Sequence, residues 1–441
     1  MSLTAQQTHP GQGSPPWAPS TWRQLPAPFW LLLSALLLNI FSGRWGDMGI
    51  PLGPDRLLFA AAFLLILLDP RIPRPRARLL HAAMLLFTAW AAASMILHGP
   101  IGIESVYTVL DRVAMPFLLF ACAPMFFRSA LQRIILLRSL TLLGVYLGCT
   151  AILETLGVNS LLLPRYIAAF KSSAGAIASG NAARAGGPFI SGEANGMALA
   201  LCAVAALLLA RLDARGWRVL GLLTGMLCLL TSVLSLTRSV WLGVLMAVFA
   251  VALSRRRLLR WLPALAVAGL LLAAAGALAM PDVAANIVER GTTSRSLNDR
   301  QNSNVAALRA LNAHPLTGVG WAQFVKVGPD WVRQADDYPV TTVNIEVHNV
   351  VLSRTAELGL PAGALFVGIL AFGPFGAALR RRSDPTEDDW RVSALAALMI
   401  WFVPAMTSPI PYPFPTFVFF TLMGLVWAWP QEHDPLTYRK A

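Results

Sequence analysis

Long runs of hydrophobic residues, separated by short polar segments, recur along almost the whole chain. A run of about 18 or more apolar residues is long enough for a helix to cross a hydrocarbon core of ~30 Å. The pattern therefore predicts an all-α polytopic membrane protein with about twelve membrane-spanning helices. We place these helices at residues 27–43, 54–69, 79–97, 106–127, 134–153, 194–210, 217–234, 238–253, 259–280, 358–379, 391–408 and 414–429.

The composition supports this class of protein. Of the 441 residues, 56% are hydrophobic and only 13% are charged, whereas about 25% of a soluble protein is charged. The four cysteines all lie inside apolar runs, so we interpret them as small hydrophobic residues and expect no disulfide or zinc site. They are Cys122, Cys149, Cys202 and Cys228.

The arginines, which account for most of the net charge of +13, are concentrated in alternate loops. One set of loops and their edges holds Arg71, Arg74, Arg76, Arg78, Arg128, Arg133, Arg138, Arg211, Arg215, Arg218, Arg255, Arg256, Arg257, Arg260, Arg380, Arg381, Arg382 and Arg391. The short loops on the other side hold only Arg44, Arg56 and Arg238. Because basic residues accumulate on the cytoplasmic side of a membrane, both chain ends are predicted to lie in the cytoplasm.

The spacing of the apolar runs divides the chain into five parts. We expect a disordered cytoplasmic tail, nine helices with one outer loop, a large outer loop, three further helices and a second cytoplasmic tail. These parts cover residues 1–26, 27–280 (with the loop at 154–193), 281–357, 358–429 and 430–441.

The large loop between the ninth and tenth predicted helices has a helical pattern of its own. In the stretch 302–313, Val305, Leu308 and Leu311 recur at the spacing of one helix face. A loop of this length with its own secondary structure is typically folded and functional. We therefore expect this partly helical loop to carry catalytic residues.

Three arginines on the predicted outer side are candidates for binding an acidic ligand. Arg184 precedes a Gly-Gly-Pro turn, Arg238 lies in a very short connection between two spans, and Arg300 lies in the large loop. The planar guanidinium group matches phosphate oxygens. The alternative is that such arginines are only solvated, although a charge held close to hydrocarbon, as at Arg238, favours a functional partner.

His348 is the candidate for acid–base chemistry. It lies between Glu346 and Asn349, just before the tenth predicted helix. A single histidine is more often structural than catalytic. On the same side as the arginines, however, an imidazole could take a proton from a sugar hydroxyl while the guanidinium groups hold a phosphorylated leaving group.

The other charged motifs are less informative. Asp111 and Arg112 lie within the fourth predicted span, and we expect them to form a salt bridge with each other. Asp336 and Asp337 could bind a divalent cation with Glu346, but adjacent acidic residues in a loop are usually solvated. The sequence contains no zinc-protease, nucleotide-binding or nucleic-acid-binding pattern, so we expect no metal, cofactor or nucleic-acid partner.

Four short motifs, taken together, resemble the superfamily of O-antigen ligases and O-antigen polymerases. They are Arg184-Ala-Gly-Gly-Pro-Phe, Ser235-Leu-Thr-Arg-Ser, Arg300 ahead of His314-Pro-Leu-Thr-Gly-Val-Gly320, and His348-Asn349 followed by Glu357-Leu-Gly359. The resemblance covers residues 180–360 in detail and the rest only as a helix count. Before Asn195 the chain has alanine, where the family pattern more often has proline.

The resemblance implies an enzyme of the bacterial inner membrane whose active site faces the periplasm. Such a glycosyltransferase takes a glycan from undecaprenyl pyrophosphate, and a ligase transfers O-antigen polysaccharide to a sugar hydroxyl of lipid A-core to complete lipopolysaccharide. The family pattern implies that Arg184 and Arg300, with Arg238 as an addition, bind the diphosphate. It implies that His348 activates the acceptor in an inverting transfer that needs neither metal nor nucleotide.

Two alternatives remain open. An O-antigen or exopolysaccharide polymerase would use the same donor and the same residues but a lipid-linked glycan as acceptor. A transporter of lipid-linked glycans would have charged residues along its helices and internal repeats. The predicted spans are nearly uncharged apart from Asp111, Arg112 and Glu154, which favours an enzyme.

Overall fold

The computed structural model describes residues 25–50, 53–70, 78–99, 102–178, 180–261, 295–332, 346–409 and 412–432, together with isolated positions between 262 and 294. The regular elements of these residues are all helical. The longer helices are α1 (Ala27–Leu38), α2 (Pro54–Leu68), α3 (Leu79–His98), α5 (Met115–Phe126), α6 (Ala130–Thr155), α9 (Gly192–Leu212), α10 (Arg215–Val233), α11 (Arg238–Ser254), α14 (Arg295–Ala313), α17 (Leu360–Leu370), α19 (Pro385–Ala405) and α20 (Pro413–Glu432). The shorter helices are α4 (Ile103–Val109), α7 (Tyr166–Lys171), α8 (Ala174–Ala178), α15 (Phe324–Trp331), α16 (Val350–Leu358) and α18 (Gly376–Leu379).

Several helices begin where polar side chains cap their free backbone N–H groups. The Ser129 hydroxyl accepts a hydrogen bond from the Gln132 N–H at 3.2 Å at the start of α6, and the Gln132 side chain accepts one from the Ser129 N–H at 2.8 Å. Asp384 caps α19 by accepting from the Glu387 N–H at 2.9 Å, with Pro385 in the first turn. These pairings satisfy N–H groups that would otherwise lack partners, so they fix where each helix begins.

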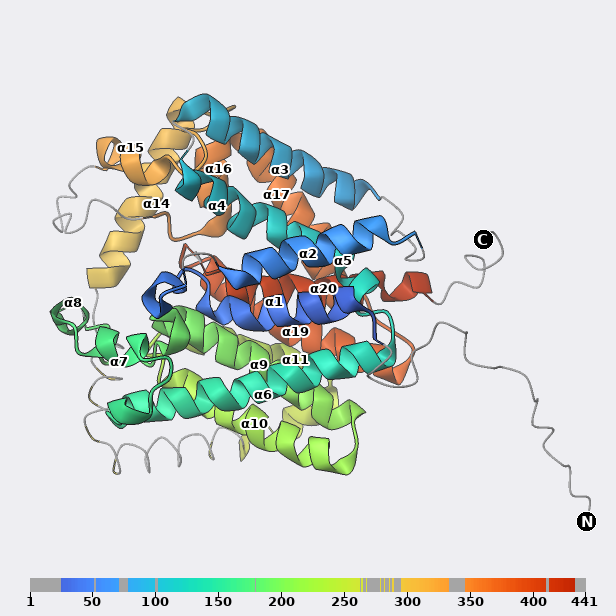
Figure 1. Cartoon of the computed structure of the whole chain (residues 1–441). Coiled ribbons are helices and arrows are strands. Elements are labelled where there is room, and N and C mark those ends of the chain that lie inside the picture. The colour runs from blue at the N-terminus through green and yellow to red at the C-terminus, as the bar shows by residue number, and fades with distance from the viewer. Residues whose placement is uncertain are drawn as a thin grey trace, which may run out of the picture.

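Helix α9 occupies the centre of the bundle. It packs against α6, α10, α19 and α20, and it is buried along almost its whole length (Figure 1). Its many alanines allow close approach: a Cβ atom added at Gly221 of α10 would meet the Ala206 carbonyl oxygen of α9 at 2.5 Å. Small residues of this kind let helix backbones pack tightly in a membrane protein.

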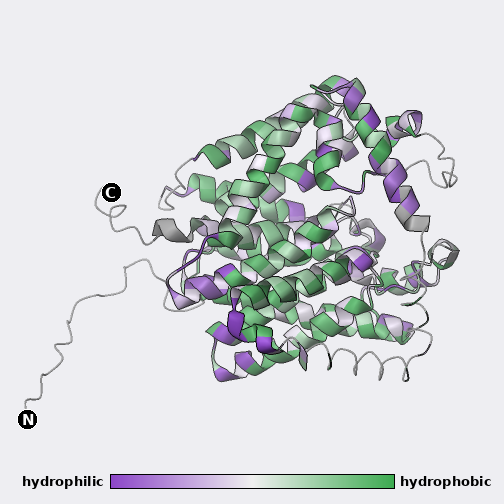
Figure 2. Cartoon of the chain, turned by 180° about the vertical axis from the view of Figure 1, so that it is seen from behind, coloured by the Kyte–Doolittle hydropathy of each residue, from purple (hydrophilic) through white to green (hydrophobic). Residues whose placement is uncertain are grey.

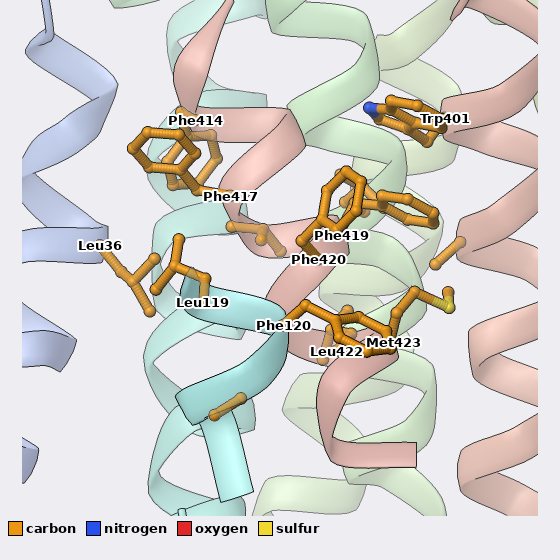
Figure 3. Close-up of a cluster of buried hydrophobic side chains, with 14 of the residues drawn as sticks. Leu36, Leu119, Phe120, Trp401, Phe414, Phe417, Phe419, Phe420, Leu422 and Met423 are labelled. Atoms are coloured by element: carbon orange, nitrogen blue, oxygen red, sulfur yellow. The ribbon is translucent and has the colours of Figure 1, made fainter. Parts of the chain in front are cut away.

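A cluster of aromatic side chains joins α5, α19 and α20 (Figure 3). Trp401 stacks on Phe419 with ring centroids 4.6 Å apart, and Phe120 meets Phe420 edge to face at 6.5 Å. Offset and edge-to-face contacts of this kind stabilise packed aromatic rings beyond the burial of their surface. The cluster holds the last helix of the chain, α20, against α5 and α19.

Six described helical segments are long and apolar enough to span a membrane, as judged by length and composition. They are Leu79–His98, Ile103–Phe126, Ala130–Thr155, Gly192–Leu212, Arg215–Val233 and Leu360–Leu379, and three shorter apolar helices lie at Ala27–Phe41, Arg238–Ser254 and Pro413–Ala428. Hydrophobic residues dominate the bundle in Figure 2, whereas α14 is largely hydrophilic. An all-helical architecture is thus confirmed for the described residues and is consistent with a polytopic membrane protein, and the number of twelve spans stays a prediction.

Some predicted segments lie wholly or mainly outside the described residues. They are the two chain ends before residue 25 and after residue 432, most of the ninth predicted helix at 259–280, and the start of the large loop up to residue 294. The Asp336-Asp337 pair also falls outside them, within 333–345. The division of the chain into five parts stays a prediction.

Part of the predicted large loop forms three helices, α14, α15 and α16. The predicted apolar face of α14 is buried only in part, because Leu311 is buried whereas Leu308 is 48% exposed, and Ala306, Ala307 and Ala310 make up most of the buried surface. The neighbouring helices α15 and α16 approach α14 closely, and alanine fits such an approach where leucine would not. Helices α7, α8, α14 and α15 lie together at one end of the bundle (Figure 1).

Candidate active site

The segment that carries Arg184 is fixed by a buried carboxylate. Glu154, at the end of α6, accepts hydrogen bonds from the N–H groups of Gly186 at 3.0 Å and Gly187 at 2.7 Å. The Lys171 ammonium group lies 3.3 Å from the same carboxylate and donates to the Arg184 carbonyl oxygen at 2.9 Å. The charged side chains of Glu154 and Lys171 therefore fix the backbone on both sides of Arg184.

Asn195 joins this segment to α9. Its side-chain amide donates to the Ala185 carbonyl oxygen at 2.9 Å, and the Ala185 N–H donates to the Leu234 carbonyl oxygen at 3.0 Å. A Cβ atom added at Gly192 would meet the Ser235 carbonyl oxygen and the Arg184 side chain. The Arg184 segment and the connection that precedes Arg238 therefore lie in direct contact.

Glu193, in the first turn of α9, interacts with two of the three predicted diphosphate ligands. Its carboxylate interacts electrostatically with Arg184 and with Arg300 of α14, and it accepts a hydrogen bond from the Ser239 hydroxyl at 3.3 Å. Arg300 in turn interacts electrostatically with Arg238, the first residue of α11. Burial lowers the pKa of Arg300, the Glu193 carboxylate opposes this shift and Arg238 adds to it. An arginine nevertheless stays protonated near neutral pH.

His348 lies beside the same stretch of α14. Its Nδ1 atom is 3.5 Å from the hydroxyl oxygen of Ser303, which is buried one turn after Arg300 and donates to the Arg300 carbonyl oxygen at 3.0 Å. His348 directly precedes Asn349, whose side chain caps α16 by accepting from the Leu352 N–H at 3.0 Å. Ser303 of α14 thus lies between the candidate base, His348, and the candidate diphosphate ligand, Arg300.

The predicted salt bridge between Asp111 and Arg112 is wrong. Asp111 pairs with Arg56 at 2.7 Å, and Arg112 pairs with Glu346 at 2.8 Å. Adjacent residues on a helix point in different directions, so their side chains reach different partners. Glu346 is only two residues from His348. The second pair therefore ties the segment that carries His348 to the helical segment that contains Arg112.

A buried ion pair near the site was not predicted from the sequence. Arg354 and Glu357 of α16 lie 3.4 Å apart, and the Arg354 guanidinium group lies 4.4 Å from the ring centroid of Trp321. Burial lowers the pKa of Arg354 to about 10 and raises the pKa of Glu357. The three-residue spacing of opposite charges was the signal for this pair in the sequence.

A small cavity reaches Arg354 from between α5, α17, α19 and α20. Arg354 and Arg112 line it together with Asp111 and Tyr412. Tyr412 also interacts electrostatically with Glu193 and Glu346. Tyr412 therefore connects the arginine cluster around Glu193 with the ion pairs beside the His348 segment.

Two glycine-containing motifs cross each other next to the site. The Gly320 N–H donates to the Glu357 carbonyl oxygen at 2.9 Å, and the Leu360 N–H donates to the Pro315 carbonyl oxygen at 2.7 Å. Gly318 and Gly359 both have positive φ angles, of 66° and 87°, and added Cβ atoms would meet the opposing backbone. Only glycine fits such a close crossing without strain.

Among the described residues, no group of three or more histidine, cysteine, aspartate or glutamate side chains is placed to hold a metal ion. The charged groups gathered in the described part of the site are mainly guanidinium groups and carboxylates. This donor set suits an anionic ligand with several oxygen atoms.

Comparison with known proteins gives one family. Residues 223–367, about a third of the chain, match the family model described as O-antigen ligase, and no curated protein matches significantly. The matched region contains Arg238, Arg300 and His348, whereas Arg184 lies before it. The match indicates a glycosyltransferase-like membrane enzyme that acts on lipid-linked glycans. It confirms the resemblance to the O-antigen ligase and O-antigen polymerase superfamily.

Proposed function

We propose that this protein is an O-antigen ligase. It would transfer O-antigen polysaccharide from undecaprenyl pyrophosphate to a sugar hydroxyl of lipid A-core at the periplasmic face of the bacterial inner membrane. The observation that carries the proposal is the grouping of charges at Arg300. Arg184 and Arg300 both interact with Glu193, Arg238 interacts with Arg300, and His348 lies beside Ser303, one turn after Arg300 on α14.

In this proposal the three arginines bind the diphosphate of the donor. Guanidinium groups fixed before the reaction can stabilise the negative charge that develops on the leaving group. Arg300 and Arg184 hold the oxygen atoms, and Arg238 adds positive charge from the start of α11. Glu193 offsets the repulsion among the arginines and keeps them in place when no donor is bound.

His348 is proposed to act as the general base. Its imidazole takes the proton from the acceptor hydroxyl as the hydroxyl oxygen forms a bond to the anomeric carbon of the donor glycan. The bond from that carbon to the pyrophosphate oxygen breaks, and the electron pair leaves with undecaprenyl pyrophosphate. One displacement of this kind inverts the configuration at the anomeric carbon.

The proposed mechanism requires neither a metal ion nor a nucleotide. Breaking the bond between the anomeric carbon and the pyrophosphate, which is a good leaving group, supplies the driving force, and the arginines neutralise the charge of that leaving group. The proton that His348 accepts returns to solvent after the product leaves.

A polymerase is the nearest alternative, since it would use the same donor and the same arginines but a lipid-linked glycan as acceptor. The family match supports either activity. The difference lies in the acceptor, so the products distinguish the two functions.

The test is to incubate the purified full-length protein with undecaprenyl-pyrophosphate-linked glycan and lipopolysaccharide that lacks O-antigen. Glycan attached to the core oligosaccharide is the expected result. Longer lipid-linked chains would instead identify a polymerase. Movement of the donor across a vesicle membrane without any covalent product would identify a transporter, and both of these outcomes contradict a ligase.

A further inference from the structure

A second cavity lies at the opposite end of α9 from Glu193. It is formed by the last turns of α9 and α11 and the first turns of α10 and α19. Glu193 and Arg211 are 18 residues apart on one helix, which corresponds to about 27 Å at 1.5 Å per residue. The cavity is therefore separate from the candidate active site.

The walls of this cavity are mostly apolar. They consist of Val204, Leu207, Leu208, Ala210, Leu222, Val251, Leu258, Val392 and Ala396. The cavity has a volume of about 540 Å³. Ligand cavities are commonly about 300–1000 Å³, so this one can accept part of a lipid molecule.

Three arginines lie among these apolar residues. Arg211, Arg218 and Arg255 line the cavity together with a single carboxylate, that of Asp389. Arg255 lies 2.7 Å from Asp389 and 2.9 Å from Asp388, while Arg211 is 3.9 Å from Asp389 and its side chain is 59% exposed. The lining therefore has more positive than negative charge, and it attracts an anion.

Two of these arginines have N–H groups that could donate hydrogen bonds to a ligand. The Nε atom of Arg255 is buried and has no hydrogen-bond partner among the described residues. Arg218 uses its Nε atom to donate to the Ala210 carbonyl oxygen at 3.2 Å, which leaves its terminal nitrogens for a ligand. A buried donor without a partner is costly, and a ligand oxygen in this position would remove that cost.

We infer that this cavity binds an anionic phospholipid, with its phosphate group at Arg211, Arg218 and Arg255 and its acyl chains along the leucine and valine walls. Basic pockets between membrane helices suit acidic lipid head groups. A soluble phosphate ion would satisfy the arginines but leave the apolar walls exposed to water. The combination of charge and apolar surface therefore favours a lipid. The inference does not depend on the proposed transfer reaction.

The first test measures lipid binding by native mass spectrometry of the full-length protein after detergent exchange. We expect phosphatidylglycerol to be retained over phosphatidylcholine, and the double variant R211Q/R218Q to bind phosphatidylglycerol about tenfold more weakly. R215Q is the matched control, because Arg215 is an exposed residue at the start of α10 that does not line the cavity. Equal retention of the two lipids, or an unchanged affinity in the double variant, would overturn the inference.

A second measurement does not depend on the arginine variants. A photoreactive amino acid at Leu222 should form an adduct with phosphatidylglycerol in reconstituted membranes. A crosslink to another segment of the same chain would show that protein fills the cavity and would refute the lipid site. Displacement of the lipid by millimolar inorganic phosphate would show that the site takes a free anion instead.

Discussion

At the scale of single residues, the site depends on how charged side chains from distant parts of the sequence come together. Arg184, Arg238 and Arg300 come from the loop before α9, the start of α11 and the middle of α14, and Glu193 interacts with the first and the last of them. The sequence motifs predicted all three arginines but gave no role to Glu193. Its importance appears only when the chain is folded.

Arg300 should not tolerate replacement by lysine if it holds a diphosphate. Lysine keeps the positive charge but loses the forked pair of N–H donors. We expect R300K to lower the transfer rate about 10- to 100-fold, because it loses hydrogen bonds to a charged group. The rate is measured with purified protein and saturating acceptor over a range of donor concentrations. R309K, on the same helix, is the control; equal activity of R300K and R309K would argue against diphosphate binding.

At the scale of structural elements, two short motifs that are about 40 residues apart in the sequence form one crossing. The 315–320 segment and the end of α16 are joined by three backbone hydrogen bonds, between Val319 and Ala356, Gly320 and Glu357, and Leu360 and Pro315. The glycines of both motifs were predicted as part of a family pattern. Their physical reason, the close approach of two backbones, comes from the structure.

Replacing Gly359 by alanine should destabilise this crossing. Its φ and ψ angles are 87° and 169°, a combination that is essentially restricted to glycine and costs another residue roughly 1–3 kcal/mol before any clash is counted. The expected result is a lower unfolding temperature of the protein in detergent micelles, together with a lower transfer rate. G368A is the matched control, because Gly368 lies in the last turn of α17 and an added Cβ atom there meets nothing within 4 Å. Similar unfolding temperatures for both variants would contradict this account of the crossing.

The ion pair between Arg112 and Glu346 should position the segment that carries His348. A shift of about 1 Å in a reacting group can slow catalysis on the order of 100-fold, so R112A and E346A should each reduce the transfer rate. Because both changes break the same contact, the double variant should be no slower than the slower single variant. Rates that multiply in the double variant would show that the two residues act independently.

At the scale of the whole molecule, the hydrophobic pattern predicted the helices well and the contacts between them poorly. The predicted span at 194–210 corresponds to α9 at Gly192–Leu212, and that at 217–234 corresponds to α10 at Arg215–Val233. Helix positions follow from local hydrophobicity. Pairing does not, since it depends on which side chains meet in space, and this is why the partners of Asp111 and Arg112 were mispredicted.

The buried face of α14 shows a second limit of the sequence pattern. The pattern placed Leu308 and Leu311 on one apolar face; Leu311 is buried as such a face requires, yet Leu308 is exposed and alanines form the contact with α15 and α16. Hydrophobicity alone does not report how closely two helices approach. The arginines and His348 could be proposed from short motifs, but their grouping required the fold.

The predicted orientation can be tested across the whole membrane protein. Cysteines introduced at Ser160 and Ser383, both exposed, should react from opposite sides of the membrane in a variant without the four native cysteines. The arginine distribution predicts that a membrane-impermeant maleimide added outside the cytoplasmic membrane labels S160C in intact spheroplasts, and labels S383C only after lysis. Labelling of both cysteines from the same side would contradict the predicted topology.

The central claim is that an imidazole and three guanidinium groups transfer a glycan from a lipid diphosphate, and the most direct measurement compares H348A with H314A in the purified transfer reaction. His314 is exposed and lies against Trp331, away from the arginine cluster, so H314A controls for the loss of a histidine. The account predicts that H348A lowers the transfer rate at least about 100-fold, as expected for loss of a general base, while donor binding and unfolding temperature stay unchanged. Glycan transfer by H348A at the rate of H314A would contradict it.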